Sequence, residues 1–221
     1  MSLVTELKEK LAPYYKSNNS AHQIDHAEAV ADLAIRMAKK YLWGRIGMKE
    51  IITACYLHDI AEGINHDNHH TIAVSMLEKG VLSEWLNLLC YRYNMPKIRI
   101  IRAVLEHRAS FEGEYSFIIS EVVSAADRGK PDVEAWVRRL IKSWIANYPQ
   151  LNVVDIITKT FGFMKKKYGR NGYTKYPDIY REFFKEELEQ AWSVIDNNNC
   201  LMCLVVRLVQ ENKRNRFYKT K

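Results

Sequence analysis

Apolar residues recur at helical spacing through most of this chain, and this periodicity is the feature that most restricts its fold. In residues 23–41, for example, Ala27, Val30 and Ala34 fall on one stripe of a helix. Only 9 glycines and 5 prolines interrupt the 221 residues, which is too few for a sheet built from many turns. We therefore predict an all-α fold, and a chain of this length can bury a full core.

The same periodicity predicts helices along the whole chain. The ambiguous stretch is 116–127, which is apolar enough to form a strand, but Ile119, Val122 and Ala126 keep helical spacing and favour a helix. A break is expected at the three asparagines 197–199, followed by a last helix. The remaining predicted helices span about residues 23–41, 49–61, 69–79, 82–93, 97–108, 131–146, 153–168 and 177–196.

Positive charge is concentrated in the C-terminal third. The net charge is +7, but residues 161–176 contribute +5 and residues 211–221 contribute +4, so the rest is close to −2. The first of these segments mixes bases, tyrosines and glycines, which could hold phosphates or single-stranded nucleic acid. A solvated basic loop that caps a helix is the stronger interpretation. With 33 basic against 26 acidic residues, the excess is mild for a dedicated nuclease.

The N-terminus and the cysteines favour a cytoplasmic protein. The first residues contain Glu6 and no apolar core, unlike a secretion signal. The 4 cysteines are scattered, so we expect reduced thiols, buried at Cys200 and Cys203. The longest apolar run, 200–206, is too short to span a bilayer, and no membrane partner is expected.

A histidine and an aspartate at the end of the second predicted helix are the centre of a candidate metal site. Adjacent side chains such as His58 and Asp59 diverge by about 100° on a helix, so both can face one ion only near its end. A buried aspartate there needs a cation or hydrogen bonds. His26 lies beside an apolar stripe, where a lone histidine is more often a satisfied core residue.

Three further residues extend this candidate site. Helix phase places His69 on the inner face of its helix and His70 nearer the edge of that face, so either could be the ligand. His107 shares a face with apolar residues, and Asp127 ends an apolar helix, where an unpaired carboxylate is costly. Imidazole and carboxylate together suit a hard or borderline divalent cation.

The contexts of four of these residues resemble the HD superfamily of metal-dependent phosphohydrolases. The resembling segments, within about residues 15–135, are His26-Ala-Glu-Ala-Val, Leu57-His58-Asp59 and Ser124-Ala-Ala-Asp127-Arg128. The resemblance implies an HD-domain-like helical bundle, which we assign to residues 1–135. We expect residues 136–221 to form a helical extension with a basic tail, packed on this core in a single globular unit. The resemblance also implies that His26, His58, Asp59 and Asp127 hold one metal.

Some HD branches hold a second metal with two more histidines. These branches include the ones that hydrolyse dinucleoside tetraphosphates or cyclic nucleotides, and His69 (or His70) and His107 stand where those histidines would be. In branches that act on deoxynucleotides or guanosine polyphosphates, an acid at the position of Glu62 works beside the metal. A solvated acid at a helix end explains Glu62 equally well. Tetraphosphatase-type sequences usually carry Lys near here, so Glu62 argues against that branch.

These features predict a metal-dependent phosphohydrolase that acts on a nucleotide or nucleotide-like phosphate ester or anhydride. One or two divalent ions (Mn, Fe, Co, Zn or Mg) would lower the pKa of a bound water toward ~7 and polarise the phosphoryl oxygen. The expected reaction is in-line attack of this activated water on phosphorus, with Asp59 and Glu62 as catalytic residues and Glu62 as proton acceptor. Arg108, Arg128 and Lys130 adjoin predicted ligands and are candidates for binding the substrate phosphate.

Other functions are less favoured by the sequence. The first alternative is an HD nuclease that binds nucleic acid through the basic C-terminal third. The second is a sensor in which the metal is structural, which the intact ligand set disfavours. A homodimer is possible, through exposed aromatic residues such as Trp85, Trp136 and Trp144.

Overall fold

The computed structural model describes residues 2–19, 22–41 and 47–217, with side chains described up to residue 212. The regular structure of these residues is helical and includes no strand, which confirms the predicted all-α fold. None of the helices in this part of the chain is long and apolar enough to cross a membrane. The chain divides into two compact units, residues 1–129 with 176–183 (the first unit) and residues 130–175 with 184–221 (the second unit).

The first segment of the first unit ends at residue 129, a few residues before the predicted domain boundary at residue 135. The chain first passes from one unit to the other at residue 130, near that boundary, and residues 176–183 return to the first unit. The packing of a C-terminal extension on the N-terminal core stays a prediction.

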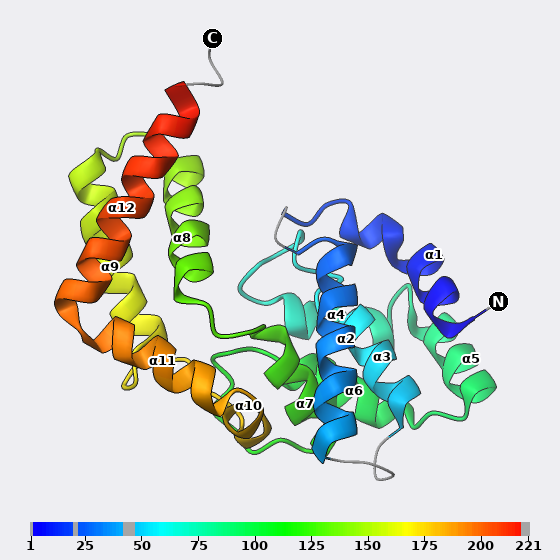
Figure 1. Cartoon of the computed structure of the whole chain (residues 1–221). Helices are drawn as coiled ribbons and strands as arrows, with labels where there is room; N and C mark the ends of the chain where they lie inside the picture. The colour runs from blue at the N-terminus through cyan, green and yellow to red at the C-terminus, as the bar shows by residue number, and fades with distance from the viewer. Residues whose placement is uncertain (1, 20–21, 42–46, 218–221) are drawn as a thin grey trace. The chain divides into compact units, whose positions relative to one another are not determined.

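The first unit is a bundle of helices packed around a shared core. α2 packs on α3 and α7, and α6 packs on α3, α4 and α7 (Figure 1). The facing side chains are small or branched and fully buried, such as Ala34, Ile51 and Val104. The helices of this unit are α1 (Leu3–Tyr15), α2 (Ile24–Tyr41), α3 (Met48–Leu57), α4 (His69–Glu78), α5 (Ser83–Tyr93), α6 (Lys97–Glu106), α7 (Ile118–Asp127) and α10 (Asp178–Phe183).

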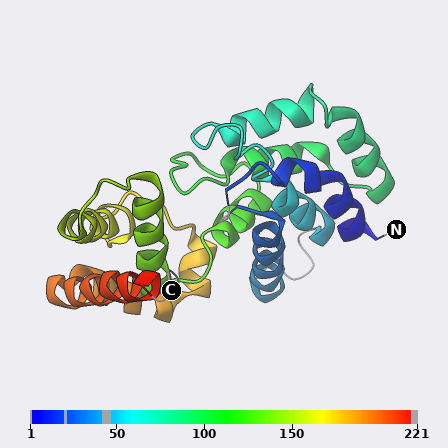
Figure 2. The ribbon, with the colours of Figure 1, turned by 90° about the horizontal axis from the view of Figure 1, so that it is seen from above.

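The first helix, α1, is not among the predicted ones. Leu7, Leu11 and Tyr15 recur every four residues and are buried, and α1 packs on α3, beside which Figure 2 also shows it in dark blue. The Tyr15 hydroxyl donates a hydrogen bond to the Tyr56 carbonyl oxygen at 3.0 Å, and burial raises the pKa of Tyr15 well above its usual value. Pro13 lies inside the last turn, although a proline at that position usually ends a helix.

Leu11→Ala is expected to lower the free energy of unfolding by about 2–5 kcal/mol, because it leaves a cavity in the core of the first unit. The Leu11 side chain is fully buried, at 0% exposure. Urea-induced unfolding followed by circular dichroism measures the effect. The exposed neighbour Lys10, changed to alanine, is the control and should shift stability by no more than about 0.5 kcal/mol. Equal effects of the two substitutions would contradict the packing of α1.

Two helices of the first unit end earlier than predicted, and both ends matter for the candidate site. α3 stops at Leu57 rather than 61, and the chain continues in turns, with the Glu62 amide donating to the Asp59 carbonyl oxygen at 3.1 Å. α6 stops at Glu106 rather than 108. His58 and His107 are therefore the residues that follow the last helical turns.

The predicted single helix over residues 177–196 is wrong. It breaks at Phe184 into α10 and α11 (Lys185–Asp196). Tyr180 is buried in the first unit, whereas Leu188 is buried in the second. The break at Phe184 coincides with the passage of the chain from the first unit to the second, which the helical spacing of the apolar residues does not reveal.

The second unit consists of α8 (Val133–Asn147), α9 (Val153–Tyr168), α11 and α12 (Asn198–Phe217). Trp136 stacks on Tyr168 with ring centroids 4.3 Å apart, and it is only 6% exposed. The expected exposure of Trp136 is therefore wrong, and Trp144 is half-buried against the same core. A homodimer stays a prediction. The expected burial of Cys200 and Cys203 is also wrong, because the inner side of α12 carries Leu201 and Val205 instead.

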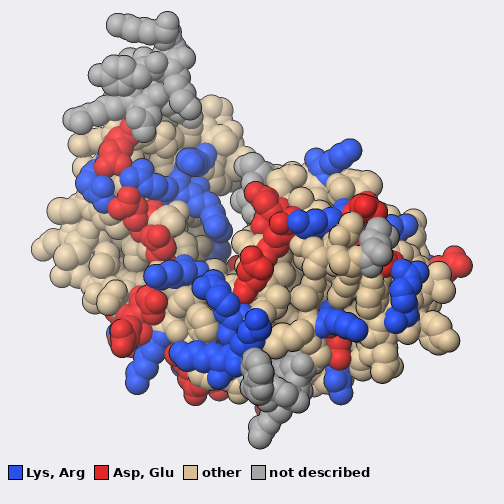
Figure 3. Space-filling view, turned by 45° about the vertical axis from the view of Figure 1, so that its right-hand side comes forward, with Lys and Arg blue, Asp and Glu red and all other residues tan. Residues whose placement is uncertain are grey.

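The second unit carries most of the positive charge, with 17 basic against 8 acidic residues, compared with 16 and 18 in the first unit. Many of these bases are paired. Arg170 lies 2.7 Å from Glu189, and Arg138 and Arg207 both bind Glu134. On the face that Figure 3 shows, basic and acidic side chains are interspersed. Ion pairing thus neutralises part of the basicity that the sequence shows.

Candidate metal centre

The six predicted metal ligands come together in the first unit. α2 supplies His26 in its first turn and α4 begins with His69, while the remaining ligands lie at the ends of α3, α6 and α7. Their donor atoms form two groups, and within each group all atoms lie within 4.8 Å of one another. One group is His26, His58, Asp59 and Asp127, and the other is Asp59, His69 and His107. Asp59 belongs to both groups.

In the first group, two imidazoles face two carboxylates. His58 Nε2 lies 3.2 Å from Asp59 Oδ2 and 3.4 Å from Asp127 Oδ1. His26 Nε2 lies 3.1 Å from Asp127 Oδ1 and 3.8 Å from Asp59 Oδ2. These two contacts show that the His26 ring has carboxylate partners and is not simply packed among apolar residues of the core.

In the second group, two imidazoles face each other and the other oxygen of Asp59. The Nε2 atoms of His69 and His107 are 3.0 Å apart. They lie 3.3 and 3.6 Å from Asp59 Oδ1. The two oxygens of the Asp59 carboxylate therefore face different groups, as they would if this carboxylate bridged two cations.

Backbone carbonyl groups set the tautomer of three of these histidines. The Nδ1–H groups of His58, His69 and His107 each donate to the carbonyl oxygen three residues earlier, at 2.7, 2.6 and 2.7 Å. A neutral ring held in this way presents the Nε2 lone pair to the cluster, which is the usual orientation of a metal-binding histidine.

The donor set fits a divalent cation. Several acceptors converge, and His58 Nε2 and Asp59 Oδ2 are buried atoms without a hydrogen-bond partner in the described structure. Buried acceptors that face one another are costly unless a positive charge lies between them. A divalent metal held by imidazole nitrogen and carboxylate oxygen satisfies all of them at once.

The pKa shifts in the cluster show that it attracts positive charge. Burial by itself lowers the pKa of His58, but the negative charges of Asp59 and Asp127 outweigh it and hold that pKa well above its usual value. Burial by itself raises the pKa of Asp59, but the positive charge of His58 and the polar contact with His107 hold it well below its usual value. Burial also raises the pKa of Asp127 by itself, but contacts with His26 and His58 hold it well below its usual value. Both carboxylates therefore stay ionised in the interior, where a cation can compensate their charge.

At the start of α4, His69 and not His70 faces the candidate site. Burial and then the charge of His107 lower the pKa of His69 to about 4, so at neutral pH its Nε2 lone pair is free to bind a cation. His70 is half-buried and belongs to neither ligand group. The helix phase thus correctly indicated which of the two faces inward.

We expect His69→Ala to remove at least one metal ion per chain and His70→Ala to leave the metal content unchanged. The first substitution deletes a donor that faces His107 and Asp59, and the second deletes a ring outside both groups. Metal analysis of the two purified variants beside the unsubstituted protein measures the difference. Loss of metal from His70→Ala alone would reverse the assignment.

Glu62 is buried rather than solvated, with 6% exposure. Its carboxylate accepts hydrogen bonds from the backbone and side-chain amides of Asn19, and it lies 3.1 Å from His66 Nδ1 and 3.6 Å from His22 Nδ1. The interpretation as a solvated acid at a helix end therefore does not hold, and the catalytic role of Glu62 stays a prediction.

The three predicted phosphate-binding residues have partners of their own. Arg108 donates to the Asp67 carbonyl oxygen, and Arg128 donates to both oxygens of Ser124. Lys130 falls in the second unit, where its ammonium lies 3.7 Å from Glu187. A role of these residues in substrate binding stays a prediction.

Sequence reasoning missed Asn18, which holds the chain around Asp59. Its side-chain amide donates to the carbonyl oxygens of Asp59 at 2.8 Å and His22 at 2.9 Å, and its oxygen accepts from the Gly63 amide at 2.8 Å. A Cβ atom at Gly63 would lie 2.4 Å from the Ser17 carbonyl oxygen, so only glycine fits there. An asparagine between two helices carries no sequence signal strong enough to find it.

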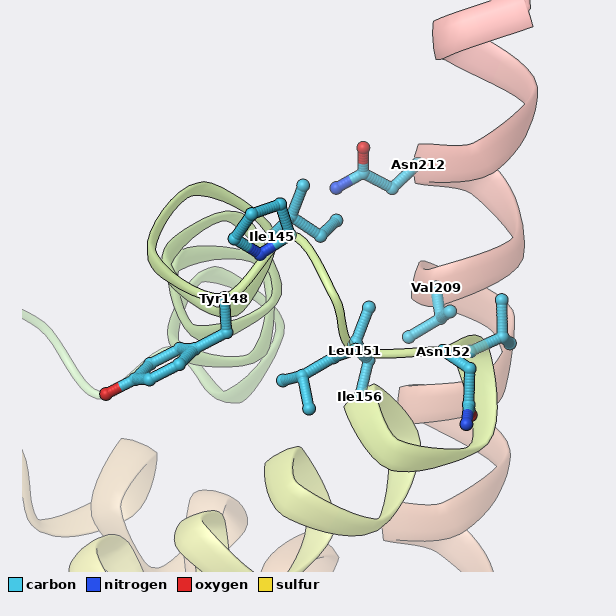
Figure 4. Close-up of a pocket in the computed structure, with 9 residues that line it drawn as sticks. Ile145, Tyr148, Leu151, Asn152, Ile156, Val209 and Asn212 are labelled. Atoms are coloured by element: carbon cyan, nitrogen blue, oxygen red, sulfur yellow. The ribbon is translucent and has the colours of Figure 1, made fainter.

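The second unit contains a separate pocket of about 380 Å³ between the end of α8, the start of α9 and α12 (Figure 4). Its lining is mainly apolar, with two asparagine amides and no acid, base or histidine among the described residues. The Tyr148 hydroxyl points away from Val209 and Asn212. The described residues that line this pocket therefore include no side chain that could catalyse hydrolysis. The lining residues are Ile145, Tyr148, Pro149, Leu151, Asn152, Val153, Ile156, Val209 and Asn212.

Comparison with known families agrees with the geometry of the ligand cluster. The family model described as HD domain matches residues 24–159, which is more than half of the chain and includes all six ligands. No match was found among curated proteins or among solved structures. The match extends beyond residue 135, where the resemblance seen in the sequence ends.

Proposed function

The chain belongs to the HD domain family, and on that premise we propose that it is a metal-dependent phosphohydrolase acting on a nucleotide or nucleotide-like phosphate ester or anhydride. One observation carries the proposal: buried and half-buried donor atoms from five helix ends converge in two groups that share Asp59. Such a cluster costs free energy unless a positive charge compensates its carboxylates and lone pairs.

Each residue of the cluster has a distinct part in the proposed site. His58, His69 and His107 hold their rings by Nδ1–H bonds and offer Nε2, while Asp59 offers one oxygen to each ligand group. When bound, a divalent cation lowers the pKa of a coordinated water and polarises the phosphoryl oxygen. We propose two ions per chain, since one carboxylate oxygen faces each group.

A substrate panel tests this function. Purified protein with Mn²⁺ or Co²⁺ should release inorganic phosphate from at least one member of a panel of nucleoside mono-, di- and triphosphates. Metal analysis of the same preparation should give about two ions per chain. Absence of release from every nucleotide, with metal bound, would reject the nucleotide substrate class.

A second candidate is a nuclease, and the observation in its favour is the excess of 17 basic over 8 acidic residues in the second unit. A protein that binds nucleic acid through phosphates loses affinity steeply as salt rises. Binding to a labelled oligonucleotide at 50 and 200 mM salt separates the two functions. Tight binding that falls by 10³-fold or more would support the nuclease, and weak binding at both concentrations would reject it.

A further inference from the structure

Imidazole rings encircle the metal centre. The chain has 7 histidines, all in the first unit, and six of the rings are neighbours in a closed sequence. Four of them are the predicted ligands, so His22 and His66 close the circle on the side of Glu62. The centroid distances are 5.6 Å for His22–His26, 5.4 Å for His26–His58, 5.1 Å for His58–His107, 5.0 Å for His107–His69, 6.1 Å for His69–His66 and 6.0 Å for His66–His22.

Glu62 and His66 form a carboxylate–imidazole pair at the edge of this circle. His66 Nδ1 lies 3.1 Å from Glu62 Oε1, a carboxylate oxygen that can accept the hydrogen bond of Nδ1–H. The Glu62 carboxylate is itself held by the backbone and side-chain amides of Asn19. The His66 side chain is 65% exposed, so the far side of its ring is open to a ligand.

The loop that carries His66 is anchored from three sides. Asn65 Oδ1 accepts the backbone amides of Asp67 and Asn68 at 3.0 and 3.1 Å, and Arg108 donates to the Asp67 carbonyl oxygen. The His66 carbonyl oxygen accepts the Nδ1–H of the metal ligand His69. The position of His66 is thus tied to the metal centre through its own backbone.

We propose that His66 protonates the leaving oxygen of the substrate and that Glu62 is the positioning residue that orients its ring. This assignment rests on the proposed phosphohydrolase function. The oxygen of the attacking water bonds to phosphorus, the bond from phosphorus to the leaving oxygen breaks, and its electron pair stays on that oxygen. The Nε2 proton of His66 then passes to it. The attacking water releases one proton to solvent as the phosphate forms, and solvent returns one proton to the His66 ring, so the net reaction is ester plus water to alcohol plus phosphate.

His66 fits this role better than His22. The His22 Nδ1 lies 2.9 Å from the amide oxygen of Asn19 but 3.6 Å from Glu62, so its close partner is neutral. A carboxylate partner compensates the positive charge of an imidazole that carries a proton on both nitrogens, whereas an amide does not. The His22 side chain is also the less exposed of the two, at 25%.

Leaving-group dependence tests the assignment. An alkyl alcoholate needs a proton as it leaves, whereas p-nitrophenolate does not. We expect His66→Gln to lower kcat/KM for the best alkyl or nucleoside monoester by about 10²- to 10⁴-fold and for p-nitrophenyl phosphate by less than about 5-fold. Glu62→Gln should show the same selectivity with a smaller loss. Both variants should keep the metal content, because neither Glu62 nor the His66 side chain belongs to a ligand group, and the His66 carbonyl oxygen that accepts from His69 remains.

Other outcomes would overturn the assignment in distinguishable ways. Equal losses with both substrates would show a structural role for His66. A selective loss confined to His22→Gln would show that His22, rather than His66, donates the proton. If the metal-loaded protein without substitutions hydrolyses neither substrate, the proposed function itself fails, and the assignment fails with it.

Discussion

Asp59→Ala is expected to abolish metal-dependent phosphate release, lowering kcat/KM by about 10³-fold or more. Asp59 is the one residue that belongs to both ligand groups, with Oδ2 toward His58 and Oδ1 toward His69. Its loss removes a donor from each metal position. Stabilisation of a phosphoryl transition state by a metal is worth several kcal/mol, and each 1.36 kcal/mol is tenfold in rate. Phosphate release under saturating Mn²⁺ measures the effect.

The matched control for this substitution is Asp32→Ala, which removes the same charge from an exposed position on α2. Its activity and metal content should equal those of the unsubstituted protein. Asp59→Asn keeps the shape of the side chain but loses its charge, and it should be almost as inactive as Asp59→Ala. Full activity of Asp59→Asn would mean that the carboxylate charge is not required, contrary to the proposed site.

Removal of metal is expected to lower the thermal midpoint of the protein by about 5–10 °C, together with complete loss of activity. A ligand that binds only the folded state at 100 times its Kd stabilises it by about 2.7 kcal/mol. For a protein of this size each kcal/mol corresponds to about 2–4 °C. The cluster is formed by residues distant in sequence, such as His26 and Asp127, so the unfolded chain cannot reproduce it. Differential scanning calorimetry before and after chelation, and again after addition of Mn²⁺, measures the shift.

Asp59→Ala provides the control for the calorimetry as well. Its midpoint should barely respond to Mn²⁺, since both metal positions are damaged. A midpoint of the unsubstituted protein that does not depend on Mn²⁺ would show that the ligand cluster does not bind this metal. A shift without any phosphate release would instead indicate the structural metal of a sensor.

The helices were largely predictable because their signal is local. Helix α9 spans the predicted residues 153–168, and α4 differs from its prediction only at its C-terminal end. Where the helix prediction was wrong, packing against residues distant in the sequence determined where the helices lie. Phe184 interrupts a helix-periodic stretch because its two halves belong to different units, and α1 continues through Pro13 while packed on α3.

The ligand residues were predictable for a related reason. A histidine or aspartate on an apolar helix face is costly, so His58, Asp59 and Asp127 stand out in the sequence without any knowledge of the fold. Glu62 and Asn18 do not stand out in this way. Their partners lie about 40 residues away or in a loop, and no periodicity connects Asn18 to Asp59.

The sequence by itself determined the helical class, the inner faces of the helices and the kinds of atoms available to a metal, because periodicity and the cost of buried charge act within one helix. It also indicated that His58 and Asp59 had to lie at a helix end to share an ion. The tertiary structure alone decided that α3 stops at Leu57, that the two Asp59 oxygens face different groups and that Asn18 donates to the Asp59 carbonyl oxygen. These features depend on how separate helices meet, and the spacing of residues along one helix does not contain that information.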